Sequence, residues 1–245
     1  MSLHFEQTGQ GHPLLLIPGA LGTGASDFPG QTGWFAERGF DVIAPDPRGY
    51  GRSRPPERDF PLDFYQRDAA DMFALMAALV HPRFSVMGWS DGANVAAIMA
   101  AEEPGRVQKL VVFGGQSFLT AEEIAAFNNI REISAWSPRA AEAMRAIYGE
   151  GLDELWDRYV AGQEALFHAG GDLYRPLLAK IRCPTFVLHG AEDPLTPGLH
   201  AEAIHRGIAG SRLHIFPKGR HNIHIRYAEE FNGLVHAFLT GPDRS

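Results

Sequence analysis

The order of short apolar runs along the chain most strongly restricts its fold. Six runs rich in Val, Ile, Leu and Phe each end in a glycine-rich or polar loop: residues 13–17, 40–44, 84–87, 110–113, 185–188 and 213–216. Short apolar runs without alternation suit strands buried on both faces. Amphipathic stretches such as 63–79 and 93–103 separate them. This order predicts an α/β fold, a mostly parallel sheet flanked by helices.

The alternation stops in the middle of the chain, where no strand-like run occurs. The spacing Thr120-x-x-Glu123 is typical of a capping box that begins a helix. Ser137 before Pro138 predicts the start of a second helix, because proline is tolerated at the first helical position. Residues 152–167 carry apolar side chains at helical spacing and predict a third.

These helices predict an insertion in one domain. The 245 residues, 45% apolar, are enough for one large core. We expect residues 1–115 and 176–245 to form the α/β core. Residues 116–175 then form a helical lid, inserted between two core strands, over one edge of the sheet.

Charge and composition exclude several classes of protein. The net charge is −7 and the basic residues are scattered, which argues against a nucleic-acid partner. The single cysteine, Cys183, excludes an intramolecular disulfide and a thiolate metal site. No apolar run approaches the roughly 20 residues of a membrane span, and the N-terminus does not resemble a signal peptide. We expect a monomeric cytoplasmic protein, without membrane association, that acts on a small molecule.

A serine between two glycines is the strongest candidate for a catalytic group. Gly88-Trp89-Ser90-Asp91-Gly92 matches G-x-S-x-G, with a predicted strand before it and a predicted helix after it. Such a turn exposes the serine hydroxyl at the helix N-terminus. The alternative is an ordinary tight turn.

A nucleophilic serine needs a base, and the base needs an orienting acid. Asp193 follows the run 185–188, and His221 follows the run 213–216 just before a helix, so the order Ser, acid, His fits. Glu192 and His224 are the alternative acid and base. His221-x-x-His224 could also hold a metal, but no third ligand is evident nearby.

An oxyanion needs two backbone N–H donors. The amide of Asp91, at the positive end of its helix, is one candidate. Leu21 or Ala20, in the loop after residues 13–17, is the second, and we favour Leu21. The alternative for this loop is a flexible connector.

Several longer motifs accompany these residues: DPRGYGRSRPP from Asp46, GWSDG from Gly88, Ile130-Arg131 with Trp136-Ser137, His189-Gly190 with Asp193-Pro194-Leu195, and GSRLH from Gly210 leading to His221-Asn222. With these motifs the chain resembles one family of the α/β-hydrolase fold, the valacyclovir hydrolase or biphenyl-hydrolase-like family of α-amino-acid ester hydrolases. The resemblance runs from about residue 13 to 239. It implies Ser90 as nucleophile, Asp193 as acid, His221 as base, and Asp91 as the carboxylate that holds the substrate ammonium.

The carboxylate beside Ser90 has a physical explanation in such a reaction. An acidic residue in the first turn of a helix gains about 0.3 to 1 kcal/mol from the helix dipole, and this alone could explain Asp91. Near a reacting ester, however, its charge opposes the developing oxyanion unless a cation lies between them. A substrate α-ammonium supplies that cation, whereas a neutral ester should lose about 1 to 3 kcal/mol of transition-state binding. We expect Ala20 and Trp89 to contact the substrate as well.

The resulting hypothesis is a serine hydrolase that cleaves α-amino-acid esters through an aminoacyl-serine, without a cofactor. The first alternative is a general carboxylesterase or a lactone or carbon–carbon bond hydrolase of the same fold. The second is a ligand receptor with slow turnover. The fold alone does not separate these functions.

Overall fold

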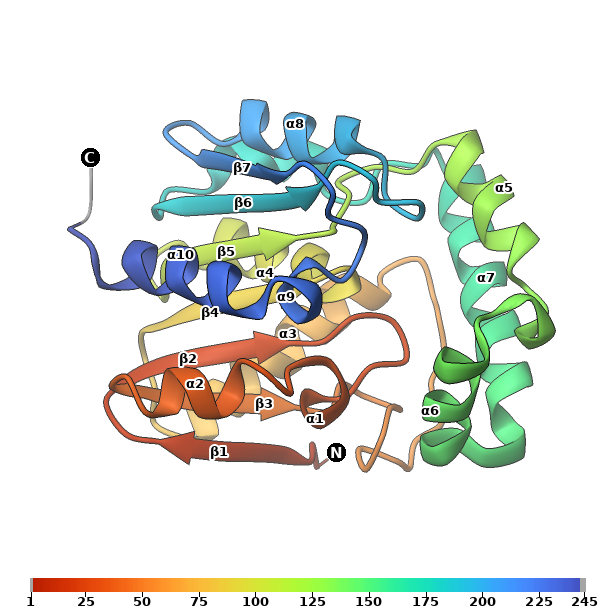
Figure 1. Ribbon diagram of the computed structural model, residues 1–245, viewed down its shortest axis with the longest axis horizontal. Coiled ribbons are helices and arrows are strands. Elements are labelled where there is room, and N and C mark those ends of the chain that lie inside the picture. The colour runs from red at the N-terminus through yellow and green to blue at the C-terminus, as the bar shows by residue number, and fades with distance from the viewer. Residues whose placement is uncertain (1, 243–245) are drawn as a thin grey trace.

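A seven-stranded sheet forms the centre of the protein (Figure 1). The computed structural model describes residues 2–242. The strand order is β1-β3-β2-β4-β5-β6-β7, and every pair is parallel except β1 with β3. The bounds are β1 Phe5–Gly9, β2 His12–Ile17, β3 Phe40–Pro45, β4 Phe84–Trp89, β5 Val107–Phe113, β6 Thr185–Gly190 and β7 Arg212–Phe216. The predicted α/β architecture is confirmed.

Helices cover both faces of this sheet. One face packs against α3 (Phe64–Ala78), α4 (Asp91–Glu102) and α8 (Gly198–Gly207). The other packs against α2 (Thr32–Ala36), α9 (Ile223–Arg226) and α10 (Ala228–Thr240). A short helix, α1 (Gly24–Asp27), follows β2. The central strands are buried on both faces because each face has its own helical layer.

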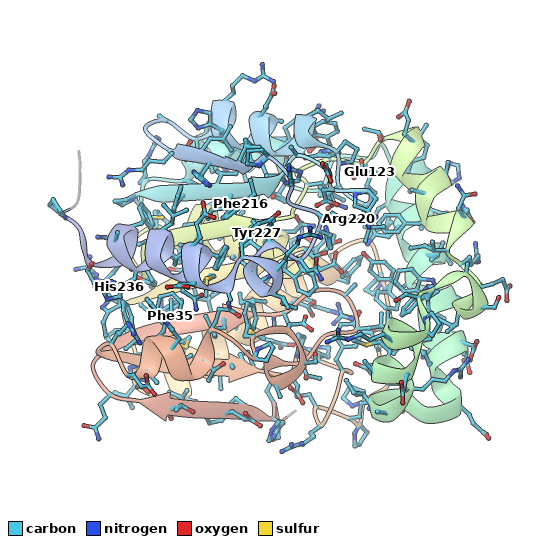
Figure 2. The ribbon with its side chains drawn as sticks, in the orientation of Figure 1. Phe35, Glu123, Phe216, Arg220, Tyr227 and His236 are labelled. Carbon is cyan, nitrogen blue, oxygen red and sulfur yellow. The ribbon has the colours of Figure 1, made fainter. Side chains whose placement is uncertain are left out.

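Aromatic side chains pack α2 and α10 against the first residue of β3, Phe40. The ring of Phe35 lies 5.6 Å from that of Phe40, and the ring of Phe40 lies 6.1 Å from that of His236. Figure 2 shows Phe35 and His236 near each other on this face. His236 therefore packs among aromatic rings, far in the fold from the loops that follow the strands.

The two edges of the sheet differ from the sequence-based expectation. All six predicted strands are present, but β1 was not predicted, because its sequence FEQTG is mostly polar and exposed. It pairs only with β3, as an edge strand. The expectation that 213–216 is buried on both faces is wrong, since β7 is the other edge strand and Ile215 is 36% exposed.

Three helices are inserted between β5 and β6, at the sheet edge where the parallel strands end (Figure 1). They are α5 (Ala121–Asn129), α6 (Pro138–Tyr148) and α7 (Leu152–His168); short 3₁₀ turns η1 (Ile133–Ala135), η2 (Gly149–Gly151) and η3 (Arg175–Lys180) accompany them. The predicted capping box of Thr120 and Glu123 is confirmed, as is the Ser137 cap of α6. That residues 116–175 act as a lid stays a prediction.

Candidate active site

The chain turns sharply at Ser90, between β4 and α4. Ser90 has φ 54° and ψ −123°, a strained conformation for a residue with a side chain. A Cβ at Gly88 would overlap the backbone of Gly92, and one at Gly92 would overlap the carbonyl of Ile17. The two glycines therefore permit the turn, which presents the Ser90 hydroxyl at the carboxyl edge of the sheet.

Two loops bring a histidine and a carboxylate to this serine. His221, in the loop after β7, has Nε2 3.1 Å from Ser90 Oγ and Nδ1 2.8 Å from Asp193 Oδ2. Asp193 follows β6, and the amides of Leu195 and Thr196 donate to its other oxygen. Although burial opposes it, the charge of His221 and these hydrogen bonds lower the pKa of Asp193. The arrangement is that of a hydroxyl, a base and an acid in one hydrogen-bonded chain.

The alternative residues lie elsewhere. His224 is fully buried, its Nε2 donates to the Asp27 carbonyl at 2.8 Å, and burial lowers its pKa to about 3. Glu192 is exposed, whereas the Asp193 carboxylate contacts His221. Within residues 2–242, no cluster of three His, Cys, Asp or Glu side chains is placed to hold a metal ion.

The loop after β2 is held by a buried carboxylate that the sequence analysis missed. Asp27 Oδ2 accepts the Gly19 amide at 2.9 Å, and burial raises the pKa of Asp27 to about 6 despite its hydrogen bonds. A Cβ at Gly22 would overlap this carboxylate. An aspartate within a four-residue helix carries no sequence signal for such a role.

The candidate oxyanion donors lie on this loop and at the start of α4. Leu21 adopts φ 60°, its carbonyl accepts the Tyr148 hydroxyl at 2.7 Å, and its side chain packs beneath the insertion. Ala20 lines the same cavity as Ser90. In the described chain the amides of Ala20, Leu21 and Asp91 donate to no protein acceptor, so all three are available to an oxyanion. The choice between Ala20 and Leu21 stays open.

A cavity of about 670 Å³ lies over Ser90 and His221, between the core and the insertion. Its wall includes Ala20 and Trp89, as expected, together with aromatic side chains of the insertion such as Trp136 and Trp156. Trp89 Nε1 donates to the His221 carbonyl at 3.0 Å. The cavity has the size and mostly apolar wall of a small-molecule site.

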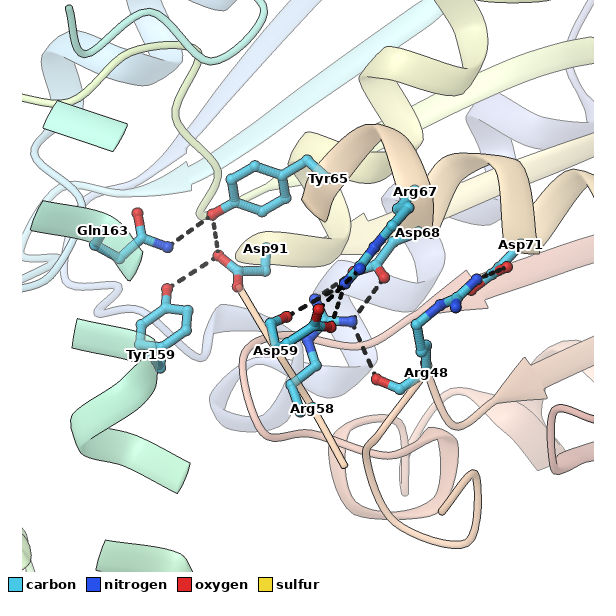
Figure 3. Close-up of polar contacts among 10 residues, drawn as sticks. All are labelled: Arg48, Arg58, Asp59, Tyr65, Arg67, Asp68, Asp71, Asp91, Tyr159 and Gln163. Carbon is cyan, nitrogen blue, oxygen red and sulfur yellow. Dashed lines mark hydrogen bonds and ion pairs between the residues drawn. The ribbon is translucent and has the colours of Figure 1, made fainter. Parts of the chain in front are cut away.

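The Asp91 side chain does not line this cavity, although we expected it to contact the substrate. Its carboxylate is buried behind Tyr159, which does line the cavity. Asp91 Oδ1 accepts the hydroxyls of Tyr65 at 2.7 Å and Tyr159 at 3.1 Å, and Gln163 donates to the Tyr65 hydroxyl at 3.0 Å (Figure 3). Burial raises the pKa of Asp91 to about 6, although the two tyrosine hydrogen bonds oppose this shift.

A second, small cavity of about 10 Å³ adjoins the Asp91 side chain, with Arg58 and Asp68 in its wall. Gly19 lines both cavities. Arg58 is fully buried and makes two hydrogen bonds to Asp68, at 2.7 and 2.6 Å, so its charge is already paired (Figure 3). The wall therefore holds two carboxylates and one guanidinium. Among the described residues Asp91 forms no salt bridge, although the charge of Arg58 partly offsets the effect of burial on its pKa.

Sequence reasoning missed the residues that surround Asp91. Tyr65 lies on α3 and Tyr159 and Gln163 lie on α7, with no spacing pattern that connects them to Ser90. Arg58 and Asp68 likewise have no local signal, because their pairing depends on how the loop after β3 folds against α3.

The comparisons with known proteins agree with this fold. Residues 12–146 match the alpha/beta hydrolase fold family. The chain is 44% identical over 242 residues to Serine hydrolase BPHL of Homo sapiens, covering 98% of this chain and 83% of that protein. The mouse protein of the same name is 43% identical over 97% of this chain and 82% of its own length.

A solved hydrolase from Pseudomonas aeruginosa PA01 superposes with a TM-score of 0.78 at 27% identity, covering 98% of this chain and 94% of that one. The fold and the hydroxyl–imidazole–carboxylate geometry define the class of serine hydrolases. Within that class, the chain belongs to the α/β-hydrolase family and to its branch that contains Serine hydrolase BPHL. No helix between residues 2 and 242 has the length and apolarity that a membrane crossing requires.

Proposed function

We propose that this serine hydrolase cleaves esters of α-amino acids. The observation that carries the proposal is Asp91, a buried carboxylate directly after Ser90 that has hydrogen bonds from two tyrosines and no salt bridge among the described residues. The guanidinium of nearby Arg58 is already paired with Asp68. A buried carboxylate without a salt bridge of its own is costly, and the raised pKa of Asp91 reflects this cost. A substrate α-ammonium would supply the missing charge.

The proposed mechanism uses Ser90, His221 and Asp193 in sequence. His221 Nε2 takes the proton from Ser90 Oγ as that oxygen attacks the ester carbonyl. The amide of Asp91 holds the oxyanion together with that of Leu21, which we favour over Ala20. The C–O bond to the leaving alcohol then breaks, and His221 returns the proton to the alcohol oxygen. Water, deprotonated by the same imidazole, hydrolyses the aminoacyl-serine and regenerates Ser90.

The position of the two cavities supports a substrate whose cation lies next to the scissile carbonyl. Gly19 borders both cavities, so the small cavity lies close to the one over Ser90, and we propose that it receives the substrate's ammonium group. That cavity has room for about one water-sized group, which an ammonium matches. A neutral ester would leave Asp91 unpaired, so selectivity comes from repulsion as well as attraction.

Matched esters test the proposal. We expect the kcat/KM of an α-amino ester to exceed that of its des-amino analogue at least tenfold, the effect of roughly 1.4 kcal/mol of charge pairing. In Asp91→Asn, which keeps the shape and both tyrosine hydrogen bonds, this ratio should fall toward one. Glu192→Gln, an exposed acid one residue before Asp193, serves as the control and should keep the ratio. A wild-type ratio near one would favour a general carboxylesterase instead.

We also propose, from the sequence alone, that the protein is monomeric and cytoplasmic. Size-exclusion chromatography with light scattering tests the first statement, and microscopy of the tagged full chain tests the second. Both are independent of the substrate proposal.

A further inference from the structure

The wall of the larger cavity has an unusual charge distribution. The chain carries a net charge of −7, yet the described residues that line this cavity include Arg220 and Arg226 and no aspartate or glutamate. The arginines come from the loop and short helix that follow β7, on either side of His221. Figure 2 shows Arg220 on the side of the core that faces the insertion.

Neither arginine is neutralised within the described part of the protein. No hydrogen bond or ion pair to a carboxylate involves Arg220 or Arg226 there, and Arg226 approaches only the ring of Tyr227, at 5.7 Å. Arg131, on the insertion, is by contrast paired with Asp157 at 2.6 Å and Glu164 at 3.2 Å. The side chains of Arg220 and Arg226 are both exposed, and Arg226 also borders a surface hollow that includes Glu229 and Glu230, but neither arginine forms an ion pair with a carboxylate of the described residues. They therefore leave positive charge at the rim of the larger cavity.

The direction of the reaction indicates which part of the substrate meets this region. The leaving oxygen must receive its proton from His221 Nε2, so the leaving group lies on the His221 side of Ser90. Asp91 is enclosed by Tyr65 of α3 and Tyr159 of α7, and its side chain adjoins the small cavity. If the acyl ammonium meets Asp91 at the small cavity, as proposed above, the two guanidinium groups of the larger cavity are left for the leaving group.

We propose that Arg220 and Arg226 bind an anionic group, a carboxylate or a phosphate, on the leaving alcohol. The substrate class is then a zwitterionic ester, with an ammonium on the acyl part and an anion on the alcohol. Guanidinium groups suit this role because they hydrogen-bond carboxylate and phosphate oxygens in pairs. This inference rests on the proposed esterase function, and it adds the chemistry of the leaving group.

The test compares three esters of the same α-amino acid. Their alcohols are ethanol, glycolic acid and 2-hydroxyethyl phosphate, so the last two differ from the first by a carboxylate or a phosphate. At low ionic strength we expect kcat/KM to be about fivefold or more higher for at least one anionic ester, mostly through KM, and salt should reduce the difference. Comparison of the two anionic esters identifies the preferred group.

Variants assign the effect to the two arginines. In the Arg220→Gln, Arg226→Gln double variant, the ratio of anionic to neutral ester should fall to about one. Arg83→Gln changes an exposed arginine before β4, outside the cavity wall, and should keep the wild-type ratio. Equal kcat/KM for all three esters in the wild type, or a preference that survives the double change, would overturn the inference.

Des-amino versions of the same three esters separate this inference from the proposed function. A preference for the anionic leaving group that persists without the amino group would support the arginine site even if the ammonium claim failed. A high amino to des-amino ratio without any leaving-group preference would support the esterase proposal and refute the arginine site.

Discussion

The ionisation of Asp91 depends on two tyrosine hydroxyls from separate helices. Tyr65 and Tyr159 both donate to one carboxylate oxygen, and these hydrogen bonds favour the charged form. Burial acts in the opposite direction and raises the pKa of Asp91 to about 6. The balance places the titration of this group close to neutral pH.

Selectivity should therefore depend on pH. As pH falls through about 6, Asp91 gains a proton and loses its attraction for an ammonium group. We expect the ratio of kcat/KM for an α-amino ester over its des-amino analogue to decline below that pH. Taking a ratio cancels the titration of the groups that both reactions share. A ratio that stays constant from pH 5 to 8 would contradict this assignment.

Removal of one tyrosine hydroxyl should raise the pH at which this selectivity ratio declines. Tyr65→Phe deletes the shorter of the two hydrogen bonds to Asp91, so the midpoint of the selectivity ratio should shift to higher pH. Tyr227→Phe, which loses only a hydrogen bond to the Lys218 carbonyl, is a matched control. Identical midpoints in wild type and Tyr65→Phe would show that this hydroxyl does not stabilise the charged form.

Residues on loops after strands could be predicted from the sequence, and residues on helix faces could not. Ser90, Asp193 and His221 each follow an apolar run, and parallel strands end at a common edge, so their proximity follows from chain order. Tyr65 and Gln163 are 98 residues apart, and their contact depends on how the insertion packs on the core.

At the scale of elements, the insertion is joined to the core through the cap of α5. Glu123 forms the capping box with Thr120, and its Oε2 also contacts His200 Nε2 of α8 at 2.8 Å. Both Glu123 and His200 are fully buried. The same side chain thus begins a helix and connects that helix to the core, a connection that capping rules could not predict.

Because Glu123 has both roles, Glu123→Ala should lower the free energy of unfolding more than Thr120→Ala does. Thr120→Ala removes one cap acceptor and should lower the free energy of unfolding by about 1 kcal/mol. Glu123→Ala also leaves His200 buried without its partner and should cost about 3 kcal/mol. Chemical denaturation measures both changes, with Ser137→Ala, the exposed cap of α6, as the comparison. Equal losses for Thr120→Ala and Glu123→Ala would exclude the contribution from His200.

At the scale of the whole molecule, function and stability oppose each other at Asp91. Its folded pKa is raised from 3.8 to about 6, so the folded state holds its proton more tightly than the unfolded chain does. Stability from this group is present below pH 3.8 and is lost as pH rises through 6. At neutral pH the ionised Asp91 therefore destabilises the fold.

Asp91→Asn and Asp193→Asn should change the free energy of unfolding in opposite directions. Asp91→Asn should raise the free energy of unfolding at pH 8 by roughly 3 kcal/mol, a gain that disappears below about pH 4. Asp193 has a lowered pKa, so its charge stabilises the fold above its unfolded pKa and this contribution is lost in acid. Asp193→Asn should therefore lower stability at pH 8. Denaturant unfolding at several pH values measures both, and a loss of stability in Asp91→Asn at pH 8 would contradict the account.

The general architecture was predictable because length, apolar order and turn residues restrict it jointly. The two cavities and the charges in their walls could not be predicted, because they depend on how elements distant in the sequence pack together. Asp91 illustrates the difference: its place after Ser90 was evident, but its burial behind Tyr159 was not.

The most direct test is the pKa of the Asp91 carboxyl with substrate bound. Carbon-13 NMR of aspartate-labelled Ser90→Ala protein, with the signal assigned by its loss in Asp91→Asn, can follow this titration without turnover. Our account predicts that an α-amino ester lowers the pKa from about 6 by at least about one unit, whereas the des-amino ester does not lower it. The same pKa with both esters would contradict the pairing of this carboxylate with the substrate cation.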